Sequence, residues 1–160
     1  MTDSDLRAAA VAILDSAPAP DEDLTAATIV GIGWATVEAD RAVVELGGTG
    51  WTQGPRDPLL GARTWLRPAL SDESLGEVTL LILEPDTEGR LAALLARFGE
   101  GVAAVYLRVA GPGAAGRGAA GPAAPGRAAP GPSSGPLGTG HLVRGGPSRG
   151  PHLIVLEGPS

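Results

Sequence analysis

The chain has 160 residues, 43% hydrophobic but only 3% aromatic, so its core must be built from Leu, Val, Ile and Ala. The lack of cysteine excludes disulfides, zinc–thiolate sites and thiol catalysis, and it favours the cytoplasm as the compartment. A formal net charge of −6 argues against nucleic acid as a partner. An acidic start and the lack of any apolar run of about 18 residues predict neither a signal peptide nor a membrane span.

The chain opens with a helical pattern over residues 4–15, for which Thr2, Asp3 and Ser4 offer N-caps. A Pro-rich stretch then ends the helix. We expect residues 1–23 to form a helical arm that packs on the body or on a second subunit, and the second arrangement would give a homodimer. The apolar stripe of this helix comprises Leu6, Ala9, Ala10, Ile13 and Leu14.

A first module is predicted over residues 24–85, and it starts with a strand and a helix. Residues 27–35 are typical of a buried strand. Thr36 is predicted to cap a helix over 37–46, which Gly47-Gly48 would end.

The rest of the first module is predicted to be a loop and two strands. Residues 49–60 are expected to be a loop, because Gly54-Pro55 and Asp57-Pro58 signal turns. Strands are predicted over 62–67 and 77–84, and the second is apolar enough to be buried on both faces.

A connecting helix is predicted within residues 86–101. Asp86 or Thr87 offers its cap, and Gly99 would stop it. Its apolar stripe comprises Leu91, Leu94, Leu95 and Phe98.

A second module is predicted over residues 102–160. It begins with a strand over 102–109 and ends with short strands over 141–144 and 152–157. Between them, residues 111–136 contain only Gly, Ala, Pro, Arg and Ser, which predicts a flexible insert without a helix. Two explanations stay open: the helix was replaced by a loop, or the stretch records a compensated frame shift in a GC-rich gene.

The order of elements is nearly a strand–helix–strand–strand–strand unit given twice. We therefore predict an α+β fold in which paired βαβββ modules form an incomplete barrel and the second module is degenerate.

The central stretch LILEPDTEGRLAALLARFGEGVAAVYLRV resembles the vicinal-oxygen-chelate (glyoxalase, bleomycin-resistance and methylmalonyl-CoA epimerase-like) superfamily. The resemblance rests on Glu84-Pro85, the helix over 87–98, the turn Gly99-Glu100-Gly101 and the strand over 102–109. The opening TIVGIGWATVEADRA and the closing PHLIVLEGPS are similar to the family's first and last strands. The resemblance implies two paired modules around a cavity, in which a divalent metal is usually held by four side chains.

The resemblance also implies where those four metal ligands should fall. They map onto Ile29, Leu81, Ala104 and Val155, which are all apolar and donate no lone pair to a cation. We therefore predict no metal, no cofactor and no catalytic residue. The family also has metal-free members that bind small molecules, so a small molecule is the partner this interpretation allows.

Strand alternation then predicts what a metal-free cavity would present. Tyr106 and Arg108 would face inward with Ala104, Gly31 with Ile29, and Glu157 with Val155. Arg108 would suit a ligand carboxylate. In the alternative, Arg108 and Glu157 lie at strand ends, in water or paired with each other, and Tyr106 is a core side chain.

Two further patterns carry little weight. Residues 111–116 match G-x-G-x-x-G, but the prolines that follow prevent the helix that a dinucleotide site needs. His141 and His152 lie on consecutive predicted strands and could approach each other, but two histidines make a poor metal site.

Three functions follow as hypotheses. The first is a metal-independent protein that binds a small amphipathic molecule. The second is an isomerase or lyase of the same family, resembling methylmalonyl-CoA epimerase or lactoylglutathione lyase, with non-standard ligands. The third is a structural or interaction module whose cavity is filled by its own side chains.

Overall fold

The computed structural model describes residues 2–16, 24, 26–68, 77–86, 89–109, 132–143 and 150–158. Most of the insert that was predicted to be flexible (residues 111–136) therefore lies outside the described residues. The end of the N-terminal arm and Thr87 lie outside them too. Among the described residues, no helix has the length and apolarity that crossing a bilayer requires. In chain order, the elements are α1 (Asp3–Ser16), β1 (Ala27–Ala35), α2 (Ala39–Glu45), β2 (Thr52–Asp57), β3 (Ala62–Pro68), β4 (Thr79–Pro85), α3 (Arg90–Phe98), β5 (Gly101–Val109), β6 (Ser133–Gly135), β7 (Gly138–Leu142) and β8 (His152–Leu156).

The strands form one 8-stranded sheet in the order β2-β3-β4-β1-β5-β8-β7-β6. Outward from the central pair β1–β5, the two modules repeat one strand order: β1, β4, β3 and β2 on one side, and β5, β8, β7 and β6 on the other. In each module the first and last strands pair in parallel, and β1 joins β5 in antiparallel fashion at the centre. The predicted α+β class and incomplete barrel are confirmed.

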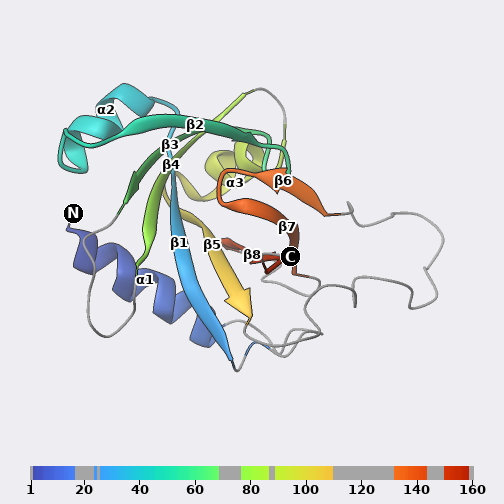
Figure 1. Cartoon of the computed structure of the whole chain (residues 1–160). Helices are drawn as coiled ribbons and strands as arrows, with labels where there is room; N and C mark the ends of the chain where they lie inside the picture. Colours follow the sequence, from blue (N-terminus) through green and yellow to red (C-terminus); the bar gives the residue numbers. More distant parts are fainter. Residues whose placement is uncertain are drawn as a thin grey trace.

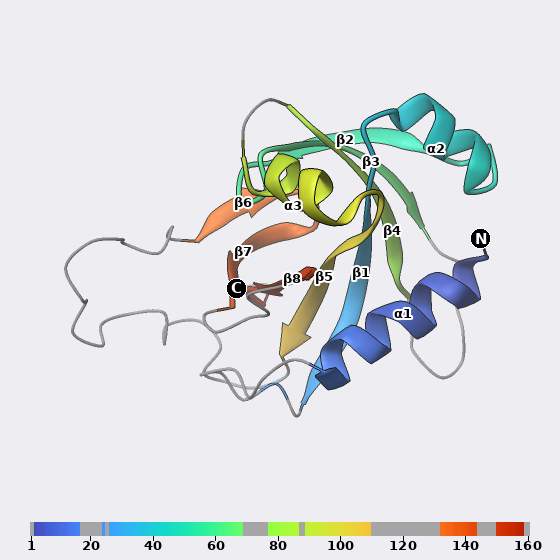
Figure 2. The ribbon, with the colours of Figure 1, turned by 180° about the vertical axis from the view of Figure 1, so that it is seen from behind.

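The sheet curls until its two edge strands meet. β2 and β6 lie at opposite ends of the strand order, yet they contact each other across a seam without pairing (Figure 1). Seen from behind, α1 crosses the sheet beside β1 and β5, and α3 lies near the other end of the barrel (Figure 2). The sheet is therefore a nearly closed barrel with helices on its flanks.

Two strands were not predicted. Residues 52–57 form β2 instead of a loop, because Pro55 lies on an edge strand, where a missing N–H costs no ladder bond. The register shift between Gly54 and Asp57 is a bulge that absorbs the turn signals. β6 lies at the end of the segment predicted to be flexible, where Ser133, Ser134 and Gly135 pair with β7.

The helices also differ from prediction at three places. The N-cap of α3 is Gly89, and not Asp86 or Thr87 as predicted, so the helix begins later in the chain. Thr36 is not the N-cap of α2, which begins after Glu38; instead its hydroxyl accepts the Glu38 N–H at 3.0 Å. Phe98 is 52% exposed and lies outside the apolar face of α3, which Leu91, Leu94 and Leu95 form. Gly99 ends α3 with a φ of 76°, a conformation that glycine adopts without strain.

The N-terminal helix is capped as its sequence indicates. The Thr2 hydroxyl accepts the Asp5 N–H at 3.2 Å, and the Asp5 carboxylate accepts the Thr2 N–H at 2.8 Å. This reciprocal pair is a capping box. The helix packs on the sheet of its own chain, where Leu6 and Ala10 are buried.

Side chains on the two faces of the sheet form separate hydrophobic clusters. The outer cluster packs under α1 and α2, and its buried members include Leu6, Ala10, Ile29, Ile32, Ala39, Ala42, Leu46, Leu80, Ile82, Val105, Leu107, Leu153 and Val155. The inner cluster packs inside the barrel and against α3, and its buried members include Leu59, Leu60, Leu81, Leu83, Leu91, Leu94, Leu95, Ala104, Tyr106, Ile154 and Leu156.

Candidate functional site

The interior of the barrel is walled by the four central strands, each of which contributes alternate residues. This inner wall comprises Gly31 and Gly33 of β1, Leu81 and Leu83 of β4, Ala104 and Tyr106 of β5, and Ile154 and Leu156 of β8. Seven of these eight positions are glycine or hydrocarbon side chains, so the wall is apolar apart from the Tyr106 hydroxyl. Apolar walls with few polar groups are typical of small-molecule sites.

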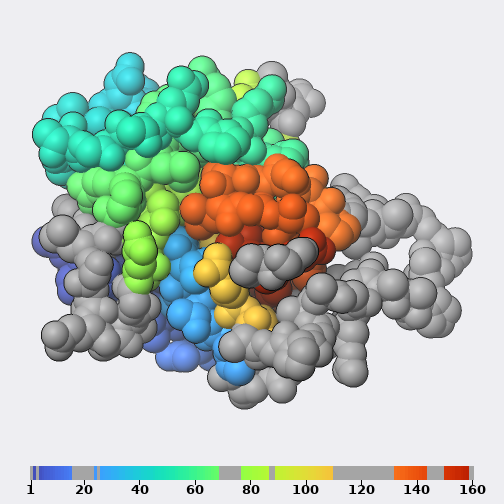
Figure 3. Space-filling view, viewed as in Figure 1, coloured from blue at the N-terminus to red at the C-terminus, as the bar shows by residue number. Residues whose placement is uncertain are grey.

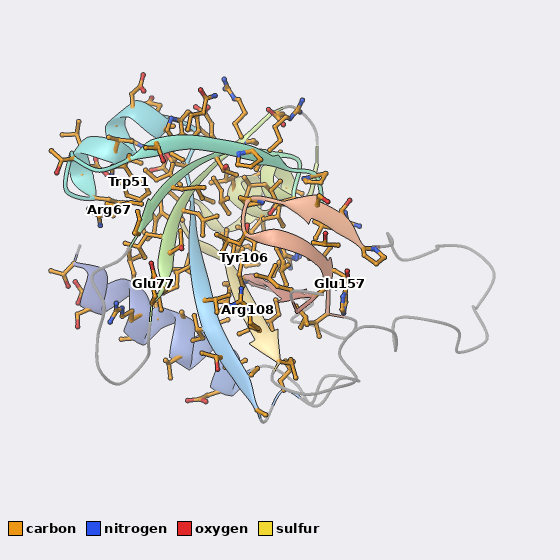
Figure 4. All side chains as sticks on the ribbon, viewed as in Figure 1. Trp51, Arg67, Glu77, Tyr106, Arg108 and Glu157 are labelled. Carbon is orange, nitrogen blue, oxygen red and sulfur yellow. The ribbon has the colours of Figure 1, made fainter. Side chains whose placement is uncertain are left out.

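The polar centre of the interior is a hydrogen bond between Tyr106 and Asp57. The Tyr106 hydroxyl donates to Asp57 Oδ2 at 2.7 Å, and both residues are 1% exposed. Asp57 ends β2 and Tyr106 lies in β5, so this bond joins the two modules. Figure 4 shows Tyr106 in the middle of the barrel.

The Asp57 carboxylate is held by backbone donors as well. Its Oδ1 accepts the N–H groups of Leu59 and Leu60 at 2.9 and 3.1 Å, as aspartate does in turns. Burial raises the pKa of Tyr106 well above 10.0, and the Asp57 charge and hydrogen bond raise it further. The tyrosine therefore stays protonated at neutral pH and donates to a carboxylate.

The hairpin formed by β6 and β7 covers this pair. Its turn brings Leu137 so close to Gly31 that a Cβ there would lie 2.3 Å from Leu137 Cδ1. Only a cavity of about 10 Å³ is left between the hairpin, Asp57, Tyr106 and β8, which is room for at most one water molecule. In the space-filling view the hairpin (orange) lies directly against β2 and β3 and covers this side of the barrel (Figure 3).

His152 lies at the edge of the same interior, at the start of β8 and opposite Ala104. Burial lowers its pKa below 6.5, the Arg90 charge lowers it further, and the Asp57 charge opposes them. The Arg90 guanidinium donates to the Leu59 carbonyl at 3.1 Å. The imidazole is therefore neutral at pH 7 and does not add a charge to the interior.

The predicted site residues divide into three groups. Gly31, Leu81, Ala104 and Tyr106 lie together on the inner wall. Ile29 and Val155 face the outer cluster, and Arg108 and Glu157 lie at or beyond the ends of β5 and β8.

The expected inward orientation of Ile29 and Val155 is wrong for two separate reasons. A bulge between Ile29 and Gly31 adds one residue to β1, so Ile29 pairs with Leu107 while Gly31 pairs with Tyr106. On β8, Tyr106 pairs with Ile154, so Val155 shares its face with Leu107.

The positions of Arg108 and Glu157 match the alternative of strand-end residues. Arg108 is exposed near the end of β5, as Figure 4 shows, and Glu157 follows the last residue of β8. The Glu157 N–H donates to the Thr139 carbonyl at 2.8 Å.

The two histidines do not come together. His141 pairs with Val155 and so shares the outer face of the sheet, whereas His152 shares the inner face with Ile154. The described residues contain no group of three or more His, Cys, Asp or Glu side chains that could hold a metal ion.

The donor set of the inner wall does not fit the divalent metal that the resemblance implies. Octahedral sites need several free nitrogen or oxygen donors, and the wall offers hydrocarbon at Leu81, Ala104 and Ile154. The buried carboxylate at the centre of the interior, Asp57, already accepts three hydrogen bonds. No chemical step through a metal is therefore derived for this chain.

A second hollow lies on the outside of the barrel, between α2 and the outer faces of β3 and β4. It is an open groove of about 430 Å³ lined by residues that include Arg41, Arg63, Trp65 and Glu84. Both arginines of its lining are paired within the protein, because Arg63 binds Glu84 at 2.6 Å and Arg41 binds Glu100 at 2.6 Å.

Sequence reasoning missed several interior residues: Leu83, Ile154 and Leu156 of the inner wall, and Asp57 and Leu137 beside it. Asp57 stands in a Gly/Pro stretch predicted to be a loop, and its partner lies 49 residues away. Its position before Pro58 and two leucines is the one available signal, since it is typical of an aspartate-capped turn.

Two parallel-paired strand sets joined at their first strands are also the fold of solved structures from the vicinal-oxygen-chelate superfamily. Solved structures of methylmalonyl-CoA epimerases, which belong to this superfamily, match the fold of the chain. No protein-family model matches the sequence, and neither does any curated protein.

Three solved structures illustrate the likeness. A Streptomyces coelicolor methylmalonyl-CoA epimerase variant in complex with 2-nitronate-propionyl-CoA is 19% identical, with a TM-score of 0.56 over 82% of this chain and 98% of that one. A methylmalonyl-CoA epimerase in complex with methylmalonyl-CoA and NH4+ is 18% identical, with a TM-score of 0.55 over 84% and 100%. The enzyme from Mycobacterium tuberculosis is 14% identical, with a TM-score of 0.53 over 82% and 89%. At these identities the likeness shows the fold alone.

Proposed function

We propose that this chain is a metal-independent protein that binds a small, mostly apolar molecule inside the barrel. The observation that carries the proposal is the inner wall, which combines hydrocarbon from four strands with one buried polar pair, Tyr106–Asp57. A hydrocarbon wall excludes water and provides the burial energy, and one polar group fixes the orientation of a ligand.

The likeness to ligand-bound epimerases supports a small molecule as the partner. Matching structures hold CoA esters, either 2-nitronate-propionyl-CoA or methylmalonyl-CoA. We propose that this chain binds a different molecule, because its inner wall offers no metal ligands. The proposal includes the cytoplasm as location, on the sequence grounds already given. A homodimer loses its sequence ground, because α1 packs on the sheet of its own chain.

One observation favours a second function, that of an interaction module without a ligand. The cavity of about 10 Å³ is too small for any organic molecule, so the interior is filled by the protein's own side chains. A ligand must therefore displace part of the protein, and the β6–β7 hairpin (Ser133–Leu142) is the element that covers the cavity.

Two measurements on the full-length protein test the proposal. Metal analysis of protein purified without chelator should find no stoichiometric transition metal. Native mass spectrometry followed by a thermal-shift screen of small neutral and charged aromatics should find a bound molecule. A ligand at about one hundred times its Kd should add about 2.7 kcal/mol of stability.

The opposite results would support the other functions. Stoichiometric nickel, cobalt or manganese, together with epimerase activity on methylmalonyl-CoA, would support an enzyme and overturn the proposal. A protein that carries no small molecule and whose melting temperature no compound changes would support the interaction module.

A further inference from the structure

The turn of the β6–β7 hairpin is held to the barrel interior by one large apolar side chain. Residues 133–140 have the sequence SSGPLGTG, in which Leu137 is the one side chain larger than proline or threonine. Leu137 is half-buried and packs against the inner cluster. Gly138 to Gly140 of β7 pair with β6, and Gly140 to Leu142 pair with β8. The Thr139 carbonyl also accepts the Glu157 N–H.

The place that Leu137 takes on the inner wall depends on a missing side chain. A Cβ at Gly31 would lie 2.3 Å from Leu137 Cδ1 and 3.2 Å from both Leu81 Cδ1 and Tyr106 Cδ2. Gly31 has no positive φ that would require glycine, so the close approach of Leu137 is what requires it. Gly31, Leu81 and Tyr106 thus form a socket, and Leu137 fills it.

The polar group beside this socket has a defined hydrogen-bonding character. The Tyr106 hydroxyl donates its one hydrogen bond to Asp57, so its oxygen can only accept a hydrogen bond from a ligand. Asp57 carries its negative charge into the interior, and both groups are 1% exposed. An anionic ligand group would be repelled in this low-dielectric place, whereas a neutral donor would be accepted.

We propose that the ligand of the barrel is a neutral apolar molecule with a hydroxyl donor, which takes the socket from Leu137 and donates to the Tyr106 oxygen. This inference rests on the proposed function, and it adds the site and the chemical class. It replaces the sequence-based expectation of a carboxylate held by Arg108, which lies exposed near the strand end. The hairpin moves outward when the ligand binds, because Leu137 and the ligand cannot share the socket.

Three probes of similar size test the chemical class: phenol, benzoate and toluene, measured by isothermal titration calorimetry. Leu137→Gly removes the side chain that fills the socket, so it should bind phenol about tenfold more tightly than the unmodified protein. Toluene should bind this variant about fivefold more weakly than phenol, and benzoate should not bind. In a Tyr106→Phe background, the preference for phenol over toluene should disappear.

A double-mutant cycle tests the socket without any ligand. Gly31→Ala should lower the urea midpoint of the unmodified protein more than that of Leu137→Gly, because the closest contact of the added Cβ is with Leu137. Gly33→Ala is the matched control: its Cβ would lie 2.5 Å from Leu83 Cδ1, so it should destabilise both backgrounds equally. If Leu137→Gly does not fold, Leu137→Ala serves in both experiments.

Each outcome supports or overturns one idea. Equal phenol affinity with and without Leu137, or tighter binding of benzoate than of phenol, would overturn this inference while leaving a ligand-binding protein. An additive double-mutant cycle would overturn the socket. If the native protein carries no molecule and neither protein binds any probe, the proposed function fails as well.

Discussion

The two modules share one strand arrangement but differ in how much sequence they use to build it. The inner strands are matched, since β1 and β5 each have 9 residues. The outer strands are not: β2 has 6 residues and β3 has 7, whereas β6 has 3 and β7 has 5. The central parallel pairs therefore specify the topology, and the outer strands tolerate truncation and glycine.

The modules also differ in what covers their outer faces. In the first module, α2 contacts β4 and buries Ala39 and Ala42. In the second, residues 111–131 contain only Gly, Ala, Pro and Arg, whose sequence predicts no helix. The N-terminal helix α1 contacts β5 and β1 instead, with Leu6 packed in the same cluster as Leu107. A helix from the start of the chain thus covers the inner strand of the degenerate module.

The largest expected effect comes from breaking the bond that joins the modules. Asp57→Ala leaves the Tyr106 hydroxyl and two backbone N–H groups without their acceptor in a buried place. We expect a loss of about 3–5 kcal/mol in the free energy of unfolding, measured by urea denaturation. Asp57→Asn keeps an acceptor for the backbone and should lose less than Asp57→Ala. A loss below about 1 kcal/mol for Asp57→Ala would show that the modules do not depend on this bond.

The next effect compares the two covering helices. Leu6 in α1 is 2% exposed, and Leu46 at the end of α2 is 6% exposed. Leu6→Ala and Leu46→Ala should each cost about 2–4 kcal/mol by urea denaturation, because each leaves a cavity in the outer cluster. Val44 is 73% exposed, so Val44→Ala should stay within about 0.5 kcal/mol. If Leu6→Ala behaved like the Val44 control, α1 would not be an equivalent of α2.

A smaller effect is expected at the Gly-Glu-Gly turn, where the second module begins. Glu100 accepts the Thr36 hydroxyl at 2.6 Å and the Val37 N–H at 3.2 Å, and it pairs with Arg41 at 2.6 Å. The hydrogen bond from Thr36 is the main cause that lowers the pKa of Glu100 below 4.5, and the Val37 N–H and the Arg41 charge lower it further. Partial burial acts in the opposite direction and raises this pKa.

Glu100→Gln should therefore cost about 1–2 kcal/mol at neutral pH, discounted because the side chain is 30% exposed. Because the folded-state pKa is lowered, this stabilisation is present above pH 4.5 and is lost as the pH falls through the folded value. Urea midpoints at several pH values would check it: a Gln variant as stable as the parent at neutral pH would contradict the role.

The smallest expected effect is a pH dependence from His152. Its folded-state pKa is lowered, so below the ordinary value of 6.5 the unfolded chain binds a proton that the folded chain resists. Stability should be highest above this value and should fall as the pH falls through it. His152→Gln should flatten this slope in urea midpoints taken between about pH 8 and pH 5.5. An unchanged slope in His152→Gln would assign the dependence to other groups.

The sequence predicted the parts of the fold that apolar runs define. β1, β4 and β5 are long hydrophobic runs, and Leu80 to Leu83 are buried on both faces as expected. β2 and β6 were missed because edge strands hold Pro55, Gly54 and serines, which carry no strand signal of their own. Their strand conformation comes from neighbours that lie far along the chain.

The interior was predictable in part, for a similar reason. The family resemblance correctly predicted Leu81 and Ala104 in the interior, and alternation along β5 added Tyr106. A single bulge then changed the face of Ile29, and periodicity gives no sign of a bulge. The Asp57 contact depends on the closure of the barrel, and Leu137 on the turn of a hairpin that no hydrophobic pattern announces.

The seam between β2 and β6 has a consequence for behaviour at high concentration. A strand with unpaired N–H and C=O groups is a template for association with other chains, and in this barrel each edge strand shields the other. Outward movement of the β6–β7 hairpin would uncover both templates at once. The protein should therefore be most prone to self-association when it is open, and a bound ligand, which holds the hairpin outward, would favour aggregation.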